Sequence, residues 1–374
     1  MKRFAALESF YQAALTGVDP EETVAQACAT VSANGIFAVG KAAAGMFRGA
    51  RRALPGARAL LILPKGYPPP SHKAGARVLF ASHPEPDSSS VRAALEAEDF
   101  FSRFGAKETL LCLVSGGASS LLCLPRNGTT LAQKREAVRR LAATGAGIAD
   151  VNRLRTSLSA VKGGRLGRRT AARLVSLVLS DVPGDRPSRV GSGPTIRGRK
   201  GDRVLVVGNN ASGLAAAGRE ARRQGWEVIT RQRPLSGEAR EEGARFARSA
   251  SRQAPGSVLL AGGETTVRLP PRRGRGGRSL ELALGAAIEL DGRAGVAVLA
   301  AGSDGVDGSS RAAGAFADGT TVARARRLGL DPEKFLARHA SEAFFNRLGD
   351  LFLTGPTGTN VGDWVFALCR ARES

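Results

Sequence analysis

The sequence has few of the residues that mark a metal centre, a disulfide scaffold or a stacking surface for bases. Its 374 residues include four cysteines and three histidines, and aromatic residues make up 5%. No CxxC pair occurs and no histidine lies near a cysteine, which argues against a zinc site and against disulfide bonds. The scarcity of aromatic side chains also disfavours a platform for single-stranded nucleic acid.

Long apolar runs are also missing. No stretch approaches the eighteen or so apolar residues that span a bilayer. Met1-Lys2-Arg3 resembles the start of a signal peptide, but Glu8 and Gln12 interrupt the apolar segment that should follow. We therefore expect no membrane span, a cytoplasmic location, and an amphipathic helix over residues 4–15.

The charge is strongly one-sided. Lysine and arginine total 55 against 33 acidic residues, a net charge of +22, and only nine of the 55 are lysines. Such a balance raises the expectation of a polyanionic partner. The arginines are scattered in short clusters along the whole chain, as compositional drift would place them. We therefore do not expect nucleic acid to be the main partner.

Apolar segments alternate with helical patterns, which indicates an α/β protein with mainly parallel sheets. The composition changes in the polar stretch 231–256, so we expect a Rossmann-like N-terminal domain over 1–230 and a smaller α/β domain over 231–374. The expected strands are 35–39, 59–63, 109–114, 174–179, 203–207, 257–261, 295–300 and 351–353, and the expected helices are 41–53, 88–104, 130–143, 210–224 and 279–290.

Several expected strands run directly into glycine-rich turns. Lys41 follows Gly40 at the end of the first strand, and Ser115-Gly116-Gly117 follows the third. Free backbone N–H groups and an ammonium at such turns suit a phosphate or a carboxylate. A surface lysine and an ordinary helix-capping turn are the alternatives, and these turns alone do not decide between them.

Acidic turns and an arginine follow other strands. Asp181 and Asp185 come after one buried strand, and Asp304 and Asp307 after another. Paired carboxylates there can hold magnesium or accept a proton, although acidic turns are also common without a function. Arg278 ends a glycine-rich loop and offers a planar fork to an oxyanion. No G-x-G-x-x-G occurs, which weakens a dinucleotide interpretation. The whole pattern indicates an anion site between two α/β domains.

These motifs stand in an order that resembles one family. The chain resembles the type II glycerate kinase (glycerate 2-kinase) family with a C-terminal MOFRL domain, over nearly its whole length. The matching segments are Val39–Ala43, His83–Asp87, Ser115–Gly117, Lys162–Leu166, Ser180–Asp185, Ser192–Thr195, Ser236–Arg240, Gly262–Val267, Gly274–Arg278, Ser303–Gly308 and Thr354–Val361.

The resemblance implies a phosphotransferase that uses ATP and Mg²⁺ to phosphorylate the 2-hydroxyl of D-glycerate in a cleft between the domains. It implies small-molecule partners, is compatible with a homodimer, and leaves open which aspartate is the base. Of the matching positions, the catalytic ones are Lys41, Arg278, Asp181 and Asp304; those binding substrate or nucleotide are Ser115, Gly116, Gly117, His83, Arg155, Lys162, Gly263, Glu264, Thr357 and Asn360; those binding metal are Asp185 and Asp307.

The sequence departs from the family pattern at several polar positions. A helical segment after Thr195 is missing, and Ser157, Leu280 and Gly362 replace a histidine, an amide and an asparagine of the family motifs. Lost polar groups leave three alternatives open. These are a kinase for another small hydroxy acid, a hydroxypyruvate reductase, and an inactive homologue that binds an anion or a partner.

Overall fold

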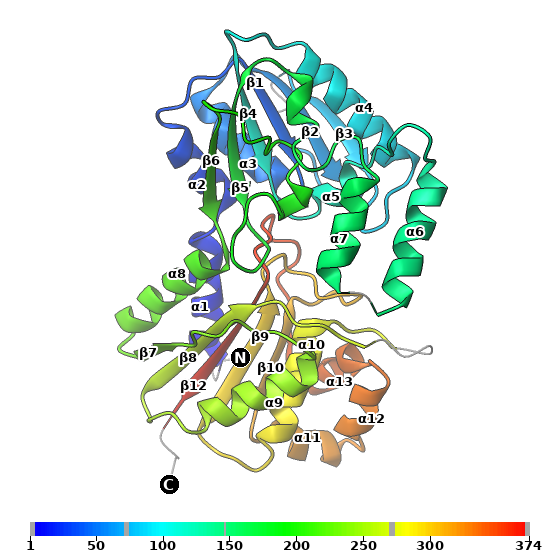
Figure 1. The fold of residues 1–374 in the computed structure, drawn as a ribbon. Coiled ribbons are helices and arrows are strands. Elements are labelled where there is room, and N and C mark those ends of the chain that lie inside the picture. The colour runs from blue at the N-terminus through cyan, green and yellow to red at the C-terminus, as the bar shows by residue number, and fades with distance from the viewer. Residues whose placement is uncertain (1–3, 71–74, 146, 269–273, 371–374) are drawn as a thin grey trace. The chain divides into compact units, whose positions relative to one another are not determined.

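The computed structural model describes residues 4–70, 75–145, 147–268 and 274–370 (Figure 1). The chain forms two compact units. One comprises Asp19–Asn209 and is called here the parallel-sheet unit. The other combines residues 1–18 with residues 210–374 and is called the mixed-sheet unit. No helix of the described residues is long and apolar enough to cross a bilayer.

The parallel-sheet unit is built on six strands in the order β3-β2-β1-β4-β5-β6, all parallel. This order reverses between β1 and β4, the arrangement of a Rossmann-like sheet. The strands are β1 (Gly35–Val39), β2 (Arg58–Pro64), β3 (Arg77–Ala81), β4 (Thr109–Val114), β5 (Arg173–Leu179) and β6 (Arg203–Gly208).

Helices lie in three of its parallel connections, from β1 to β2, from β3 to β4 and from β4 to β5, the arrangement typical of parallel pairing. Their first turns are capped where the sequence provides short polar side chains. Asp19 caps α2, Asp87 caps α4, and Thr130 and Gln133 form a capping box at α6. The helices are α2 (Pro20–Cys28), α3 (Ala43–Ala53), α4 (Ser88–Ser102), α5 (Ala118–Leu121), α6 (Leu131–Ala143) and α7 (Ile148–Ser157).

The mixed-sheet unit has six strands in the order β11-β10-β9-β12-β8-β7. Only β7 and β8 pair in parallel, and the other neighbours are antiparallel. The expectation of mainly parallel pairing is therefore wrong for this sheet, because β12, near the end of the chain, inserts antiparallel between β8 and β9, and β10 pairs antiparallel with both β9 and β11. The strands are β7 (Glu227–Thr230), β8 (Ser257–Gly263), β9 (Val296–Gly302), β10 (Gly314–Asp318), β11 (Leu351–Phe352) and β12 (Asp363–Cys369).

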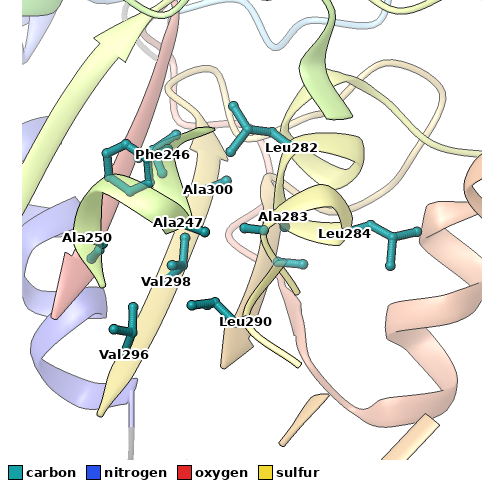
Figure 2. Packing of buried hydrophobic residues seen from close by; sticks show 14 of the residues in the cluster. Phe246, Ala247, Ala250, Leu282, Ala283, Leu284, Leu290, Val296, Val298 and Ala300 are labelled. Atoms are coloured by element: carbon teal, nitrogen blue, oxygen red, sulfur yellow. The ribbon is translucent and has the colours of Figure 1, made fainter. Parts of the chain in front are cut away.

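The core of the mixed-sheet unit lies where α9 and α10 pack on the sheet. Figure 2 shows Phe246 and Ala247 of α9 with Leu282 and Ala283 of α10 beside Val298 of β9, all buried. Small residues let the helices approach closely, since a Cβ on Gly243 would lie 2.0 Å from the Leu282 carbonyl oxygen. The helices are α1 (Ala5–Thr16), α8 (Asn210–Arg223), α9 (Ala239–Ala250), α10 (Arg278–Glu289), α11 (Thr321–Arg327), α12 (Pro332–Ala337) and α13 (Ser341–Leu348).

The division of the chain differs from the expected boundary at residue 230. Helix α8 belongs to the mixed-sheet unit because Asn210 Nδ2 donates to the carbonyl oxygens of Val361 and Asp363 at 3.0 Å, and Trp364 Nε1 donates to Asn210 O at 3.2 Å. Helix α1 packs on α8, and the buried Tyr11 hydroxyl donates to Gly302 O at 2.7 Å. Both ends of the chain therefore build one unit.

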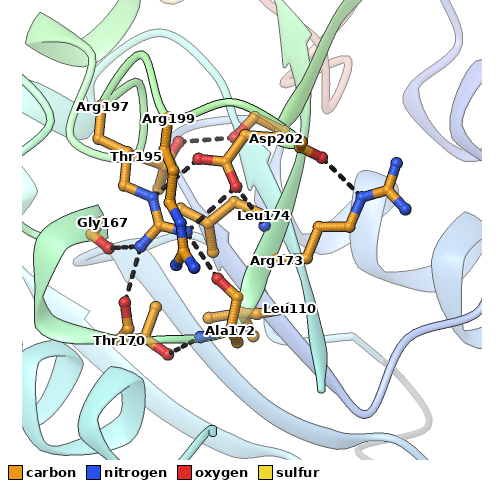
Figure 3. Close-up of polar contacts among 12 residues, drawn as sticks. Leu110, Gly167, Thr170, Ala172, Arg173, Leu174, Thr195, Arg197, Arg199 and Asp202 are labelled. Carbon is orange, nitrogen blue, oxygen red and sulfur yellow. Dashed lines mark hydrogen bonds and ion pairs between the residues drawn. The ribbon is translucent and has the colours of Figure 1, made fainter. Parts of the chain in front are cut away.

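A buried ion pair lies directly before β6, the last strand of the parallel sheet, and connects it to the start of β5. Arg197 and Asp202 have side chains only 4% and 9% exposed, and their closest N–O distance is 2.8 Å (Figure 3). The remaining guanidinium N–H groups donate to the carbonyl oxygens of Gly167, Thr170 and Ala172, while Asp202 accepts from Leu174 N–H at 2.9 Å. Each buried polar atom of the pair thus has partners, which such a pair needs to be stable.

Candidate active site

The first cluster of candidate residues lies at the carboxyl edge of the parallel sheet, where the strand order reverses. Val39 and Val114 are paired at the ends of β1 and β4, so the turns that follow them lie side by side. Lys41 N–H donates to Gly116 O at 2.9 Å, and Ala42 N–H donates to Ser115 Oγ at 3.1 Å. In open α/β sheets, ligands bind at this reversal point.

His83 joins this cluster from the loop after β3. A Cβ on Gly117 would lie 3.2 Å from His83 Cδ2 and 3.3 Å from Lys41 Cγ, so the two side chains flank the same glycine. Gly117 has a φ of +87°, which favours glycine and turns the chain into α5. The structure therefore brings together Lys41, His83, Ser115, Gly116 and Gly117, called here the Lys41 cluster.

The backbone N–H and the hydroxyl of Ser115 form hydrogen bonds within the two turns. Ser115 N–H donates to Val39 O at 3.1 Å, and its hydroxyl accepts from Ala42. The expectation that Ser115 N–H faces an anion is therefore wrong, because the strand ladder takes it. For Gly116 and Gly117, no acceptor of the N–H group occurs within the described part of the chain. These two amides, with Lys41, are the donors that an oxyanion could use.

The acidic residues of the same unit lie at the same sheet edge. Asp181 follows β5, and Asp185 accepts a hydrogen bond from Asn209 Nδ2, just after β6, at 2.7 Å. Among the described residues, no group of three or more His, Cys, Asp or Glu side chains could hold a metal ion. A magnesium ion held by Asp181 and Asp185 would therefore take its other ligands from water, from backbone oxygens or from a substrate.

Lys162 and Arg155 line a pocket of the parallel-sheet unit that adjoins the Lys41 cluster. The cavity of about 360 Å³ is bordered by the loop after His83, by the residues after Gly117, and by α6 and α7. The buried Lys162 ammonium donates to the carbonyl and hydroxyl oxygens of Ser119. Burial, then repulsion by Lys134, lowers the pKa of Lys162 to about 7.

The second cluster lies in the mixed-sheet unit around Arg278, the first residue of α10. Its guanidinium donates to Glu264 and contacts both carboxylate oxygens of Asp363 at 3.3 Å. Burial acts to lower the pKa of Arg278, but Asp363 and Glu264 outweigh it and the net shift is upward. Asp363 is therefore a site residue that sequence reasoning missed, since 85 positions separate it from its partner.

Asp307 stabilises the start of α10 in this cluster. Its buried carboxylate accepts the N–H groups of Ser279 at 3.1 Å and Leu280 at 2.7 Å, so it caps α10. A Cβ on Gly277 would lie 2.3 Å from Asp307 Oδ1, which explains a glycine there. Burial raises the pKa of Asp307 to about 6 and that of Asp363 to about 7. The cap fixes the start of α10 and therefore Arg278.

The remaining candidates of this unit lie on turns, two of which are joined by hydrogen bonds. Thr357 Oγ1 donates to Ser303 O at 2.5 Å, and Thr357 N–H donates to Asp304 O at 3.2 Å. Asn360 lies on the same loop as Thr357, which runs from β11 to β12. Gly263 ends β8 with a φ of +152°, and a Cβ there would lie 2.5 Å from Leu235 O.

Comparisons with known proteins identify the family. A family model described as a domain of unknown function, DUF4147, matches residues 6–207, and the MOFRL family model matches residues 257–363. A D-glycerate 2-kinase of Thermotoga maritima is 34% identical over 77% of this chain and 79% of its own length. A glycerate 2-kinase of Pyrococcus horikoshii is 30% identical over 90% and 88%. The chain belongs to the glycerate kinase family.

The fold agrees with this membership. The crystal structure of the glycerate kinase from Thermotoga maritima matches with a TM-score of 0.88 and 30% identity, over 98% of this chain and 99% of that one. The family is one of phosphotransferases with an alcohol acceptor. A protein of Agrobacterium vitis that is 38% identical, over 77% of this chain and 86% of its own, carries the provisional name hydroxypyruvate reductase. The Lys41 cluster lies in the DUF4147 match and Arg278 in the MOFRL match.

Proposed function

We propose that this protein transfers the γ-phosphoryl group of ATP to the 2-hydroxyl of D-glycerate, giving 2-phosphoglycerate and ADP. The observation that carries the proposal is the position of Lys41, beside His83 and the amides of Gly116 and Gly117, which have no acceptor among the described residues, at the reversal point of a Rossmann-like sheet. An ammonium and backbone N–H groups are the donors that stabilise a transferring phosphoryl group. The glycerate kinases among the relatives support the same reaction.

In the proposed reaction, the glycerate 2-hydroxyl oxygen bonds to the γ-phosphorus while the bond from that phosphorus to the bridging oxygen breaks. The hydroxyl proton passes to a carboxylate, for which Asp181 and Asp304 are the candidates. Arg278 neutralises charge on the phosphoryl group or on the glycerate carboxylate. Because Asp363 and Glu264 already contact Arg278, its net field is weaker than that of an isolated cation.

We assign binding of the substrates to the turns around these groups. Gly263 and Glu264 lie on one of them, at the end of β8, and Thr357 and Asn360 lie on another, between β11 and β12; Arg155 and Lys162 line the pocket of the parallel-sheet unit. The carboxylates fit a magnesium ion that nucleotide phosphates also hold, with Asp185 as a ligand, rather than a cage made of protein groups alone. Asp307 is the weaker candidate, because its oxygens already cap α10.

The test is a coupled assay of ADP release with ATP, magnesium and D-glycerate, with the product identified by phosphorus NMR. The proposal requires a 2-phosphoglycerate signal and a loss of turnover of about a hundredfold or more in Lys41→Ala, the size expected when charge stabilisation is lost. Lys107→Ala is the matched control, because Lys107 is exposed. Full turnover in Lys41→Ala would show that the site is misplaced.

A reductase is the second candidate, favoured by the relatives of Agrobacterium vitis that bear that provisional name. The sequence carries no G-x-G-x-x-G turn for a dinucleotide. Oxidation of NADH in the presence of hydroxypyruvate, without release of ADP, would replace the kinase proposal. Absence of both activities from the folded protein would support an inactive homologue, for which the replaced polar residues are the reason.

A further inference from the structure

The pocket beside α6 and α7 is lined by an excess of positive charge. Its border carries five basic side chains and one acidic one, Glu85, which is exposed and already paired with Arg135 at 2.8 Å. The basic side chains are Lys134, Arg135, Arg139, Arg155 and Lys162. Figure 1 shows α6 and α7 next to each other in the parallel-sheet unit. The cavity of about 360 Å³ has the size of a small-molecule site.

Two of these cations are buried, and neither has a carboxylate partner among the described residues. Lys134 is 4% exposed, and its Nζ makes no hydrogen bond within the described part of the chain. Lys162 is 2% exposed, and its ammonium donates only to Ser119 oxygens there. Burial lowers the pKa of Lys134, and the neighbour that opposes this shift is the Cys123 thiol, which is a weak acceptor. Burying unpaired ammonium groups is costly, so a fold that keeps two of them on one cavity is suited to a negatively charged ligand.

The pocket adjoins the Lys41 cluster in sequence and in space. His83 precedes the lining residues Pro84 and Glu85, and Gly117 precedes the lining residue Ser119 by two positions. Two loops of the proposed active site therefore form one wall of the cavity. A ligand in the cavity would contact residues that closely follow His83 and Gly117 in the chain.

We propose that this pocket binds the oxyanion of a small molecule, a phosphoryl or a carboxylate group, with Lys134 and Lys162 as the two neutralising cations. Ser119 and Arg155 supply further donors. The proposal extends the site of the proposed function through the shared Lys162, but anion binding there does not require that phosphoryl transfer occur. Lys134 has no place in the family motifs described above, and only its burial against the cavity identifies it.

The experiment measures binding by isothermal titration calorimetry on the full chain at pH 7, without turnover. Inorganic pyrophosphate and D-glycerate are separate probes, which distinguish a phosphoryl from a carboxylate ligand. We expect at least one probe to bind, and Lys134→Met and Lys162→Met each to raise its Kd about tenfold or more, as loss of a charge-assisted hydrogen bond does. Lys107→Met, at an exposed lysine, should leave the Kd unchanged.

Two further measurements keep the outcome decisive. Methionine removes a buried charge while it fills the space, so Lys134→Met should melt at the same or a higher temperature than the wild type, and the bound probe should raise the melting temperature of the wild type only. If Lys162→Met does not fold, Lys134→Met alone decides. Failure of both probes to bind, unchanged binding in both variants, or loss of binding only in Lys41→Met would overturn the proposal.

Discussion

Gly40, between β1 and Lys41, offers the sharpest test of the geometry at the Lys41 cluster. Its φ is +125°, and a Cβ there would lie 2.2 Å from Ser115 Oγ, 2.7 Å from Ser115 O and 2.9 Å from Gly116 O. The hydroxyl could rotate only by giving up Ala42 N–H, and the Gly116 carbonyl could move only by stretching the 2.9 Å bond from Lys41 N–H. The steric clash in Gly40→Ala can therefore be relieved only by breaking or lengthening one of these hydrogen bonds.

The magnitude follows from two contributions. A positive φ costs a residue with a Cβ roughly 1–2 kcal/mol, and overpacking against backbone roughly another 1–3 kcal/mol, so we expect Gly40→Ala to lose about 2–5 kcal/mol. Gly66→Ala is the matched control, because Gly66 has a φ of +85° in open space and should show only the first contribution. Gly56→Ala, with open space and no positive φ, should leave stability unchanged or slightly higher.

The assay must report on the correct unit. Trp226 and Trp364 both lie in the mixed-sheet unit, so tryptophan fluorescence does not follow unfolding around Gly40. Hydrogen exchange followed by mass spectrometry, on peptides that cover β1 and β4, gives the local free energy of opening. Turnover measured on the same samples should fall with it. If Gly40→Ala exchanges no faster than Gly66→Ala, the close packing of the two turns is refuted.

Three further predictions concern buried charges. Arg197→Met should destabilise the chain by about 3–5 kcal/mol, since it leaves the Asp202 carboxylate buried without its cation; a urea midpoint within error of the wild type would contradict the pair. The pKa of Lys162 is lowered to about 7, so between pH 7 and the ordinary pKa of lysine the unfolded chain binds more protons than the folded one. The free energy of unfolding should therefore rise over this pH range, by up to about 1.4 kcal/mol per pH unit. Lys162→Met should lack that rise when urea midpoints at pH 7.5 and 9 are compared. The raised pKa of Asp363, about 7, has the opposite effect, so the free energy of unfolding should fall as the pH rises from about 4 to 7. Asp363→Asn should remove part of that fall, and it should lower turnover about tenfold because Asp363 positions Arg278. Unchanged kinetics in that variant would exclude Asp363 as a positioning residue.

The sequence by itself predicted the elements whose hydrophobic pattern is decided locally. The strands expected at 35–39 and 109–114 have these bounds in β1 and β4, because both are continuous apolar runs that end at glycine or serine turns. Helices α4 and α6 begin at the residues that their capping side chains indicate. The motifs at strand ends predicted the turns of Lys41 and Ser115, since parallel strands bring their carboxyl ends to one edge. The family resemblance is confirmed.

Only the tertiary structure decided which distant residues meet. Strands β3 and β7 are half-exposed edge strands that the sequence pattern did not predict, since their apolar runs, Val78–Ala81 and Val228–Ile229, are short. Strand β12 pairs antiparallel with both β8 and β9, and β10 pairs antiparallel with β9, so the second sheet is mixed; the start of β12 places Asp363 against Arg278.

The same holds for the division of the chain and for the buried lysines. Helix α1 joins the second unit through packing on α8, which no local pattern near residue 18 reveals. Lys134 lies on a helix with a mostly polar sequence, where a lysine indicates an exposed face; only the fold shows that it is buried. Burial and pairing depend on contacts between segments far apart in the chain, and these contacts determined the charge at both clusters.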